Sequence, residues 1–450
     1  MRLSLGDHRS AFEVLKVVER PVGFITQPQA SHFVTPPRSI LRRLPWIAIA
    51  LTFLVIAGSA FAIEPIRDAI TRSGVDDARL ERSFGYVVLG PISSVLDALT
   101  LFTVGQIIGF ALWFLGLYAA IRFFRRLDHG VTIGREASYA VAAFVTLLAA
   151  YAAAAVLPRP MAQLIITRSD VIAIDFHSHT RFSHDGRADW SSSDLRAWHA
   201  AAGFNVAYVT DHATLDGVTE AIAMDSTVAG QGTTLLPGLE VFYHGEHVNL
   251  LNAGLRYKGL TTADYRDLDD KALGLASLIT GLEPILIETI PGELSHMIPA
   301  TGRGVPGVRA IEIVDGSPRG MSQTRRDHDR IVQLADSLHL ALVAGSDNHG
   351  WGKTAPGWTM MRLPGWRGYP PAELASEIEN VIRVAGRGAT HVVERTTASV
   401  SPIAVALTLP AVAWTVSRTL SPNERLAWFF WIWVPWSLAW FIRRAAATPR

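Results

Sequence analysis

Two patterns of hydrophobic and polar positions divide this chain. Long uncharged runs occupy residues 46–63, 98–121 and 137–157, and polar residues concentrate in the middle of the chain. Each run is long enough, at 1.5 Å per residue of helix, to cross a hydrocarbon core of about 30 Å. A helix also satisfies its own backbone groups, as lipid requires. The pattern predicts three transmembrane helices within residues 45–158.

Two further apolar segments lie near the C-terminus, at residues 396–417 and 426–442. The first contains Pro402 and Pro410, and the second is short and rich in tryptophan, which favours the headgroup interface. They predict a pair of spans within residues 396–443, with a re-entrant or interfacial pair as the alternative. Gln106 is the main polar exception inside the runs, so they indicate an anchor rather than a transport path.

Arginines near the runs predict an orientation. Residues 1–44 are too long for the n-region of a signal peptide, which indicates a retained anchor with a cytoplasmic N-terminal segment. Because arginines in short loops favour the cytoplasm, the central domain is expected on the extracytoplasmic side. Arg443, Arg444 and Arg450 argue against this, because five spans would place them outside. The arginines that set the orientation are Arg38, Arg42, Arg43, Arg122, Arg125, Arg126 and Arg135.

Between residues 164 and 395 short β-rich runs alternate with amphipathic stretches. This alternation is typical of βα units on a parallel sheet. Helices are expected in "SSDLRAWHAAAG", capped by Ser192 or Ser193, and in "SQTRRDHDRIVQLADSL". The pattern predicts an α/β domain built as a distorted (β/α)7 barrel and flanked by the transmembrane helices. The seven predicted strands are residues 171–175, 205–210, 234–242, 247–253, 284–290, 308–314 and 340–346.

Polar residues follow the ends of these strands. In such barrels the carboxyl ends of the strands meet at one mouth and carry the chemistry. Side chains alternate along an extended strand, so the two imidazoles of His-Ser-His point to the same side. A single histidine there is more often structural, but a converging set favours a metal site. The converging residues are His177, His179, Asp211, His212, Glu240, Asp347 and His349.

Composition narrows the chemistry. The chain has no cysteine and 15 histidines, so any metal must be held by His, Asp and Glu. Such a set suits zinc, manganese or iron better than calcium. The formal net charge of +1 gives no reason to expect nucleic acid as a partner.

Four segments resemble the successive motifs of the PHP (polymerase and histidinol phosphatase) superfamily. They are "DFHSHTRFSHDG", "YVTDHAT", "PGLEVFYHGEHVNLL" and "AGSDNHG", within about residues 170–390. The resemblance implies a distorted seven-stranded barrel with a trinuclear metal centre, usually used to hydrolyse phosphoesters. "HVNLL" and "SDNHGWG" look most like the branch that includes carbaryl-type hydrolases, which cleave a carbamate ester.

The resemblance also implies the role of each site residue. Asp185 matches an acidic position that binds metal or a water, and Asp175 and Asp211 match groups that fix imidazole tautomers. The implied ligands are His177, His179, Asp347 and a bridging Glu240 for the first metal, His184, His212 and His349 for a further metal, and His247 for the remaining one.

The chain departs from the family pattern at one place. A histidine is expected after the fifth strand, and "PILIETIPGELSH" has Ile290 there. His296, Glu288 or His244 could replace it. We therefore expect either two or three divalent ions.

These residues favour a hydrolase in which a hydroxide bridging the metals attacks phosphorus or a carbonyl carbon. Arg181, and also Arg319 and Lys353, could contact a phosphate, and Asp185 could protonate the leaving group. A phosphoesterase acting on a small-molecule or lipid-linked ester at the bilayer is the first hypothesis. A carboxyl or carbamate ester hydrolase with the same site is the second. A non-catalytic metal-binding sensor or binding module is the alternative of another class. The sequence predicts no oligomeric state.

Overall fold

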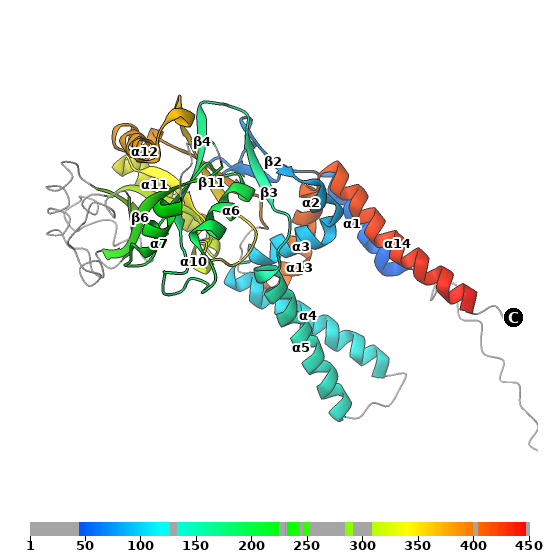
Figure 1. The fold of residues 1–450 in the computed structure, drawn as a ribbon. Coiled ribbons are helices and arrows are strands. Elements are labelled where there is room, and N and C mark those ends of the chain that lie inside the picture. Colours follow the sequence, from blue (N-terminus) through cyan, green and yellow to red (C-terminus); the bar gives the residue numbers. More distant parts are fainter. Residues whose placement is uncertain are drawn as a thin grey trace, which may run out of the picture. The chain divides into compact units, whose positions relative to one another are not determined.

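The computed structural model describes residues 45–126, 133–224, 230, 232–243, 246–251, 284–290, 308–398 and 404–446. Apolar helices occupy both ends of this range, and a mixed sheet with covering helices lies between them in sequence (Figure 1). The helices at the two ends are α1 (Trp46–Ala60), α2 (Phe84–Val88), α3 (Gly90–Thr100), α4 (Val104–Arg126), α5 (Ile133–Val156), α13 (Ala404–Thr419) and α14 (Pro422–Ala446).

All seven predicted strands are confirmed as neighbours in one ten-stranded sheet. The sheet has the order β1-β12-β11-β4-β5-β6-β7-β8-β9-β10. Most neighbours among the seven are parallel, but β7 is antiparallel to both β6 and β8. The seven are β4 (Val171–Ser178), β5 (Val206–Val209), β6 (Thr234–Tyr243), β7 (Glu246–Leu251), β8 (Ile285–Glu288), β9 (Val308–Asp315) and β10 (Ala341–Gly345).

The sheet curls so that the end of β10 returns to β4. The backbone N–H of Asp347 donates to the carbonyl of His177 at 2.9 Å, and that of His179 donates to the carbonyl of Asn348 at 3.1 Å. Ser178 and Asn348 form a parallel bridge between the two segments. These contacts bring the first and last of the seven strands together, as a distorted barrel requires.

Five strands were not predicted from the sequence. β11 (Gly357–Arg362) and β12 (His391–Arg395) extend the sheet beyond β4 by antiparallel pairing, and β1 (Ile66–Asp68) pairs with β12. β2 (Ala78–Arg82) and β3 (Ala162–Ile166) form a separate two-stranded sheet. β1 and β2 fall within residues 45–158, so this stretch, predicted as a membrane region, also supplies strands to the folded domain.

Helices cover both faces of the sheet. One face of the curled strands packs around Phe176, Tyr208 and Ile287 together with α12 (Pro371–Ala385). The other face packs against α6 (Ser192–Ala202), α7 (Asp216–Met224) and α11 (Arg325–Leu338). The caps of α6 and α11 are Ser191 and Thr324, so the N-cap predicted at Ser192 or Ser193 is one or two residues late. The remaining short helices are α10 (Pro318–Met321), η2 (Trp366–Gly368) and η3 (Gly386–Gly388).

The second predicted span does not begin at Ala98. Ala98 belongs to α3, and a new helix, α4, starts at Val104. Thr103 causes this break, because its hydroxyl accepts from the Gln106 N–H and the Gln106 side chain accepts from the Thr103 N–H, both at 3.0 Å. This reciprocal capping box fixes the start of α4. Gln106 is therefore a capping residue rather than a polar group in mid-span.

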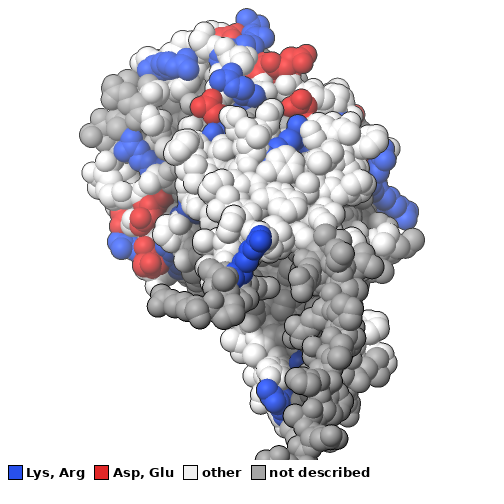
Figure 2. All heavy atoms as spheres, turned by 90° about the vertical axis from the view of Figure 1, so that its right-hand side faces the viewer, with Lys and Arg blue, Asp and Glu red and all other residues white. Residues whose placement is uncertain are grey.

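Two helices of the described chain are long and apolar enough to cross a membrane, Val104–Phe124 and Gly134–Val156. α1 is apolar but only 15 residues long, and α13 and α14 do not meet the same test. Large apolar side chains are exposed along these helices, including Phe53 (72%) of α1 and Phe430 (62%) of α14. Figure 2 shows a broad uncharged area on one face of the molecule, with Lys, Arg, Asp and Glu at its margins.

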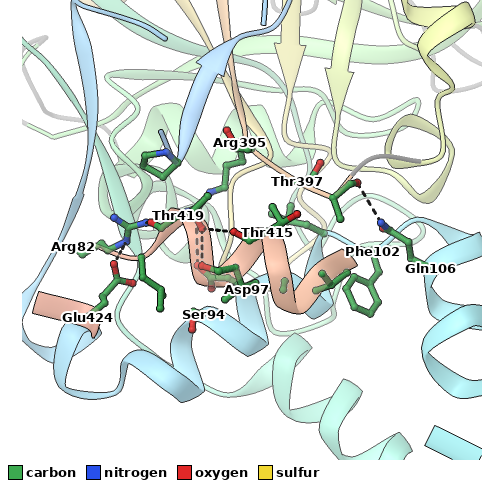
Figure 3. Close-up of a pocket in the computed structure, with 18 of the residues that line it drawn as sticks. Arg82, Ser94, Asp97, Phe102, Gln106, Arg395, Thr397, Thr415, Thr419 and Glu424 are labelled. Atoms are coloured by element: carbon green, nitrogen blue, oxygen red, sulfur yellow. Dashed lines mark hydrogen bonds and ion pairs between the residues drawn. The ribbon is translucent and has the colours of Figure 1, made fainter. Parts of the chain in front are cut away.

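A buried ion cluster connects α3 to the barrel (Figure 3). Asp97 of α3 is 4% exposed and binds Arg159 at 3.0 Å and the hydroxyl of Thr354 at 2.9 Å. Its other oxygen accepts from the Tyr86 hydroxyl at 3.0 Å and lies 3.5 Å from Arg395 of β12. A carboxylate with these partners joins elements that lie far apart in the sequence.

Candidate metal centre

Four of the predicted ligands meet at the carboxyl end of the curled strands. Nε2 of His177 lies 3.1 Å from Oε2 of Glu240 and 3.3 Å from Oδ1 of Asp347. Nε2 of His179 lies 3.2 Å and 3.3 Å from the same two oxygens. Two imidazoles and two carboxylates therefore point at one position. They come from β4 and the residue after it, from β6, and from the segment after β10.

Glu240 connects this position to a neighbouring one. Its second oxygen, Oε1, lies 2.7 Å from Nδ1 of His247 on β7, while Oε2 also lies 3.4 Å from Nδ1 of His212. One carboxylate thus faces imidazoles with both oxygens. This is the geometry that a bridging carboxylate needs.

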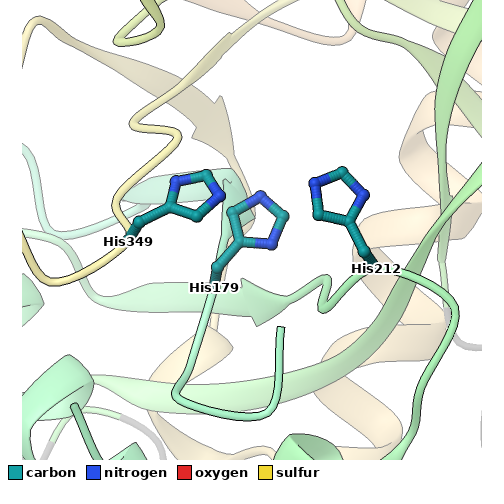
Figure 4. A group of neighbouring side chains, drawn as sticks. All are labelled: His179, His212 and His349. Carbon is teal, nitrogen blue, oxygen red and sulfur yellow. The ribbon is translucent and has the colours of Figure 1, made fainter. Parts of the chain in front are cut away.

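Asp185 gathers a third set of groups on the outer side. Its Oδ2 lies 3.1 Å from Nε2 of His349 and 3.4 Å from Nε2 of His212, and the ring of His184 lies 4.8 Å from that of His212. Figure 4 shows His179 between His212 and His349. Their ring centroids are 4.9 Å and 4.0 Å from that of His179. All predicted ligands within the described residues are therefore brought together, and His296, like His244, lies outside them.

The backbone near the site is strained at two places. Asp347 has φ 47° and Ala213, directly after His212, has φ 51°. Residues with a Cβ rarely adopt this left-handed conformation, and such strain concentrates at functional sites. The side chain of Asp347 lies 3.3 Å from both His177, in β4, and His179, directly after it.

Buried carboxylates support the imidazole of His177 from behind. Its Nδ1 lies 3.0 Å from Glu312 and 3.5 Å from Asp315, both on β9. Gly345 leaves room for this contact, because a Cβ there would lie 2.3 Å from Glu312 Oε1. Sequence reasoning missed both acids. "IEIVD" contained them, but nothing marked them as facing the site.

The roles predicted for Asp175 and Asp211 are wrong in detail. Asp175 accepts from the backbone N–H groups of His177 and Ser346, and its other oxygen lies 2.7 Å from the ring of His199, which is not a predicted ligand. Asp211 accepts from the backbone and hydroxyl of Thr180, both at 2.6 Å. These aspartates hold the backbone at the strand ends that carry the predicted ligands. They do not bond the imidazole rings of those ligands in the described part of the chain.

The charges of the site shift its pKa values. Complete burial lowers the pKa of His179, but the nearby carboxylates of Asp347 and Glu240, 3.3 Å and 3.2 Å from its Nε2, outweigh it and raise that pKa to about 9. Burial lowers the pKa of His212 to about 4 despite the nearby carboxylate of Glu240. Partial burial raises the pKa of Asp185, but the Ser183 hydroxyl and His349 lower it further, to about 2. Asp185 is thus ionised at neutral pH.

These residues fit divalent ions. Groups of three ligand atoms, such as His177, His179 and Glu240, lie within 4.8 Å of one another. Both ring nitrogens of His179 are buried without a hydrogen bond of good geometry to any described residue. Buried polar atoms normally have partners, so an unsatisfied imidazole facing two carboxylates suits a cation between them.

Glu288 does not take the place of the expected histidine. Along β8 it shares the face of Leu286, which packs with Leu239 and Val241 of β6. Glu240 lies between these two residues in sequence and points to the opposite face. Glu288 is buried and its pKa is raised to about 9, chiefly by burial.

The predicted cationic residues lie beside other partners. The guanidinium of Arg181 pairs with Glu220 of α7 and lies 5.1 Å from the Phe182 ring. Arg319 lies 3.6 Å from Glu246, and the Lys353 ammonium lies 5.3 Å from the Trp190 ring. A contact from any of them to substrate stays a prediction.

Comparisons with known proteins give only distant likeness. The sequence matches no family model and no curated protein. Among solved structures it is similar to PsfC from Pseudomonas syringae, with 17% identity over 54% of this chain and 96% of that one and a TM-score of 0.34. It is also similar to a lesion-specific endonuclease from Pyrococcus furiosus, with 12% identity over 42% of this chain and 52% of that one and a TM-score of 0.32. An amidohydrolase from Chromobacterium violaceum has 17% identity over 45% of this chain and 96% of that one, with a TM-score of 0.27. Likeness of this degree carries no information about what the chain binds or cleaves.

Proposed function

We propose that the chain is a membrane-anchored, metal-dependent hydrolase of the PHP type that cleaves phosphoesters. One observation carries the proposal: His177 and His179 converge on the same oxygens of Glu240 and Asp347. These four groups come from three separate segments. Asp347 has an unusual backbone conformation, and the ring nitrogens of His179 are unsatisfied. Burying such groups together without a cation is costly in free energy.

Each side chain has a role in this proposal. Divalent ions at such a site lower the pKa of water and stabilise charge on a phosphoryl group. His177, His179, Glu240 and Asp347 would hold the inner ion. His212, His349 and His184 would hold an outer ion, and His247 would complete a position on the far oxygen of Glu240.

Asp185 suits proton acceptance better than donation. It is ionised and 42% exposed, and it faces His212 and His349. In hydrolysis the oxygen of water forms a bond to phosphorus, the bond to the leaving oxygen breaks, and the leaving oxygen gains a proton. Asp185 could accept the proton lost by the attacking water, whereas its predicted role as a leaving-group acid is disfavoured by its low pKa.

Membrane anchoring is part of the proposal. α4 and α5 are the helices whose length and composition permit crossing, and exposed apolar side chains continue over α1 and α14. The placement of the barrel on the extracytoplasmic side stays a prediction from the arginine distribution.

The test is a substrate and variant screen on the purified full chain. With manganese or zinc added, we expect turnover of p-nitrophenyl phosphate or its bis ester. We expect His177→Ala and Asp347→Ala to lower it more than about a hundredfold. His391→Ala changes a histidine of β12 that pairs with Asp68 and should leave turnover unchanged. Exclusive turnover of carboxyl or carbamate esters would favour the second hypothesis. Stoichiometric metal binding without hydrolysis of any ester would favour a sensor or binding module.

A further inference from the structure

A cavity joins the candidate metal centre to the apolar helices. Its volume is about 490 Å³, within the range of small-molecule sites. Asp185, Asp347 and His349 are among the residues that line it. Leu99 at the end of α3 and Tyr151 and Ala155 in the last turns of α5 also line it, and we call these three residues its apolar wall. One space is therefore lined by charged groups of the site and by apolar groups of the helices.

The apolar wall belongs to a helix whose other faces are suited to lipid. α5 is one of the two helices that could cross a membrane, and Phe144 (50%), Val145 (56%) and Leu148 (52%) are exposed along it. The end of α5 is fixed to the barrel, because the Gly352 N–H donates to the Ala155 carbonyl at 2.8 Å. The cavity therefore lies where this helix meets the barrel.

Two aromatic residues at the cavity also indicate an amphiphile. Trp351 is 51% exposed and lines the cavity, and tryptophan favours the boundary between lipid and water. The Tyr151 hydroxyl is buried and has no hydrogen-bond partner within the described part of the chain. Because this hydroxyl is inaccessible, the ring of Tyr151 is the part that lines the cavity, and it adds to the apolar wall.

We infer that the substrate is a lipid phosphoester whose headgroup lies against Asp185 and His349 and whose hydrocarbon chain lies against Tyr151 and Ala155. This inference rests on the proposed function, because it takes the metal centre as the place of cleavage. A bilayer lipid can supply both parts of such a ligand, whereas a fully water-soluble phosphoester would leave the apolar wall uncovered.

The test compares substrates with a short and a longer alkyl group. It uses the full-length protein in detergent with manganese added. Substrates are the methyl and hexyl diesters of p-nitrophenyl phosphate, and binding probes are methylphosphonate and hexylphosphonate, which cannot be hydrolysed in this way. Each buried methylene contributes about 0.8 kcal/mol, which is about a fourfold change in affinity. We expect kcat/KM and phosphonate affinity to be at least about tenfold higher for hexyl than for methyl.

Matched variants on α5 locate the effect. Ala155→Phe fills the apolar wall and should reduce the hexyl-to-methyl ratio toward one. Ala152→Phe places the same ring at an exposed position of the same helix and should leave the ratio unchanged. Equal values for both chain lengths in the wild-type chain, or a ratio that Ala155→Phe does not alter, would overturn the inference.

The two proposals fail in different ways. Hydrolysis that does not depend on the length of the alkyl group would overturn the inference of a lipid substrate, and the proposed hydrolase function would stand. Chain-length-dependent binding of phosphonates without hydrolysis of any ester overturns the hydrolase and supports the amphiphile cavity.

Discussion

At the scale of single residues, the imidazole of His177 has carboxylates on both sides. Nε2 faces Glu240 and Asp347, and Nδ1 faces Glu312 at 3.0 Å. With a cation held by Nε2, Nδ1 would carry the ring proton and would donate a hydrogen bond to Glu312. Such a partner fixes the ring orientation and increases its basicity as a ligand.

Replacement of Glu312 should therefore weaken metal binding. We expect Glu312→Ala to lower metal affinity about 10- to 100-fold, and Glu312→Gln, whose amide oxygen can still accept from Nδ1, to lower it less. The measurement is competition with a chromogenic chelator. Glu394→Ala on β12, which removes a carboxylate paired with Arg67 rather than with a site histidine, is the control. Unchanged affinity in Glu312→Ala would remove its positioning role.

The pH dependence of metal binding follows from His179. Without metal its pKa is raised to about 9, so at pH 7 a proton must leave before the nitrogen can bind a cation. From this proton alone, metal affinity should rise about tenfold from pH 7 to pH 8, by less from pH 8 to pH 9, and then level off. The metal-free chain should show the opposite trend in stability: the contribution of a raised histidine pKa is complete below pH 6.5 and is lost by about pH 9. Titrations at pH 7, 8 and 9 that give one affinity would contradict the assignment.

Residue types and spacing could predict which side chains converge at the candidate metal centre, but not the carboxylates that lie behind His177. His177, His179, Asp347 and His349 occur at alternate positions beside strand ends, where both spacing and chemistry are informative. Glu312 and Asp315 lie in an ordinary buried strand, and which of its side chains face the site depends on the register between β9 and β10, which shifts near Val343. Register is a property of strand pairing, and sequence pattern alone does not supply it.

At the scale of elements, the seven barrel strands could be predicted because each is a short apolar run bounded by turn residues. β1 could not be predicted, because a strand of three residues is too short to show an alternating hydrophobic pattern. Its pairing partner, β12, also lies more than 300 positions away in the sequence. The break before α4 was missed for a different reason. Residues 98–121 are uniformly apolar, so hydropathy alone merged two helices, although Thr103 and Gln106 had the spacing of a capping box.

Loss of this cap should destabilise the start of α4. We expect Thr103→Ala to lower the free energy of unfolding by about 1 kcal/mol, because it leaves the buried Gln106 N–H without its acceptor. Thr146→Ala is the control, since the Thr146 hydroxyl is exposed and bonds only within α5. Thermal unfolding in detergent measures both. Equal midpoints for the two variants would show that the cap contributes nothing.

At the scale of the whole molecule, the membrane-type helices and the barrel are joined by more than the chain itself. Asp97 contacts Arg159, Thr354 and Arg395, which come from the segment after α5, from the loop after β10 and from β12. Figure 3 shows Asp97 and Arg395. The loop with Thr354 directly follows the segment that carries Asp347 and His349. The position of α3, and with it one wall of the cavity, is therefore linked to the candidate metal centre.

Removal of Asp97 should uncouple these parts. Asp97→Ala leaves two buried guanidinium groups without their shared carboxylate, a change that typically costs about 3–5 kcal/mol. We expect the wild-type chain to unfold in one transition, and Asp97→Ala to unfold at a lower temperature in detergent with separate transitions for the barrel and the helices. Asp336→Ala breaks an exposed pair with Arg387 and should cost less than about 1 kcal/mol. If Asp97→Ala unfolds in one transition at the wild-type temperature, the ion cluster does not connect the two parts, and another set of contacts must hold α3 beside the site.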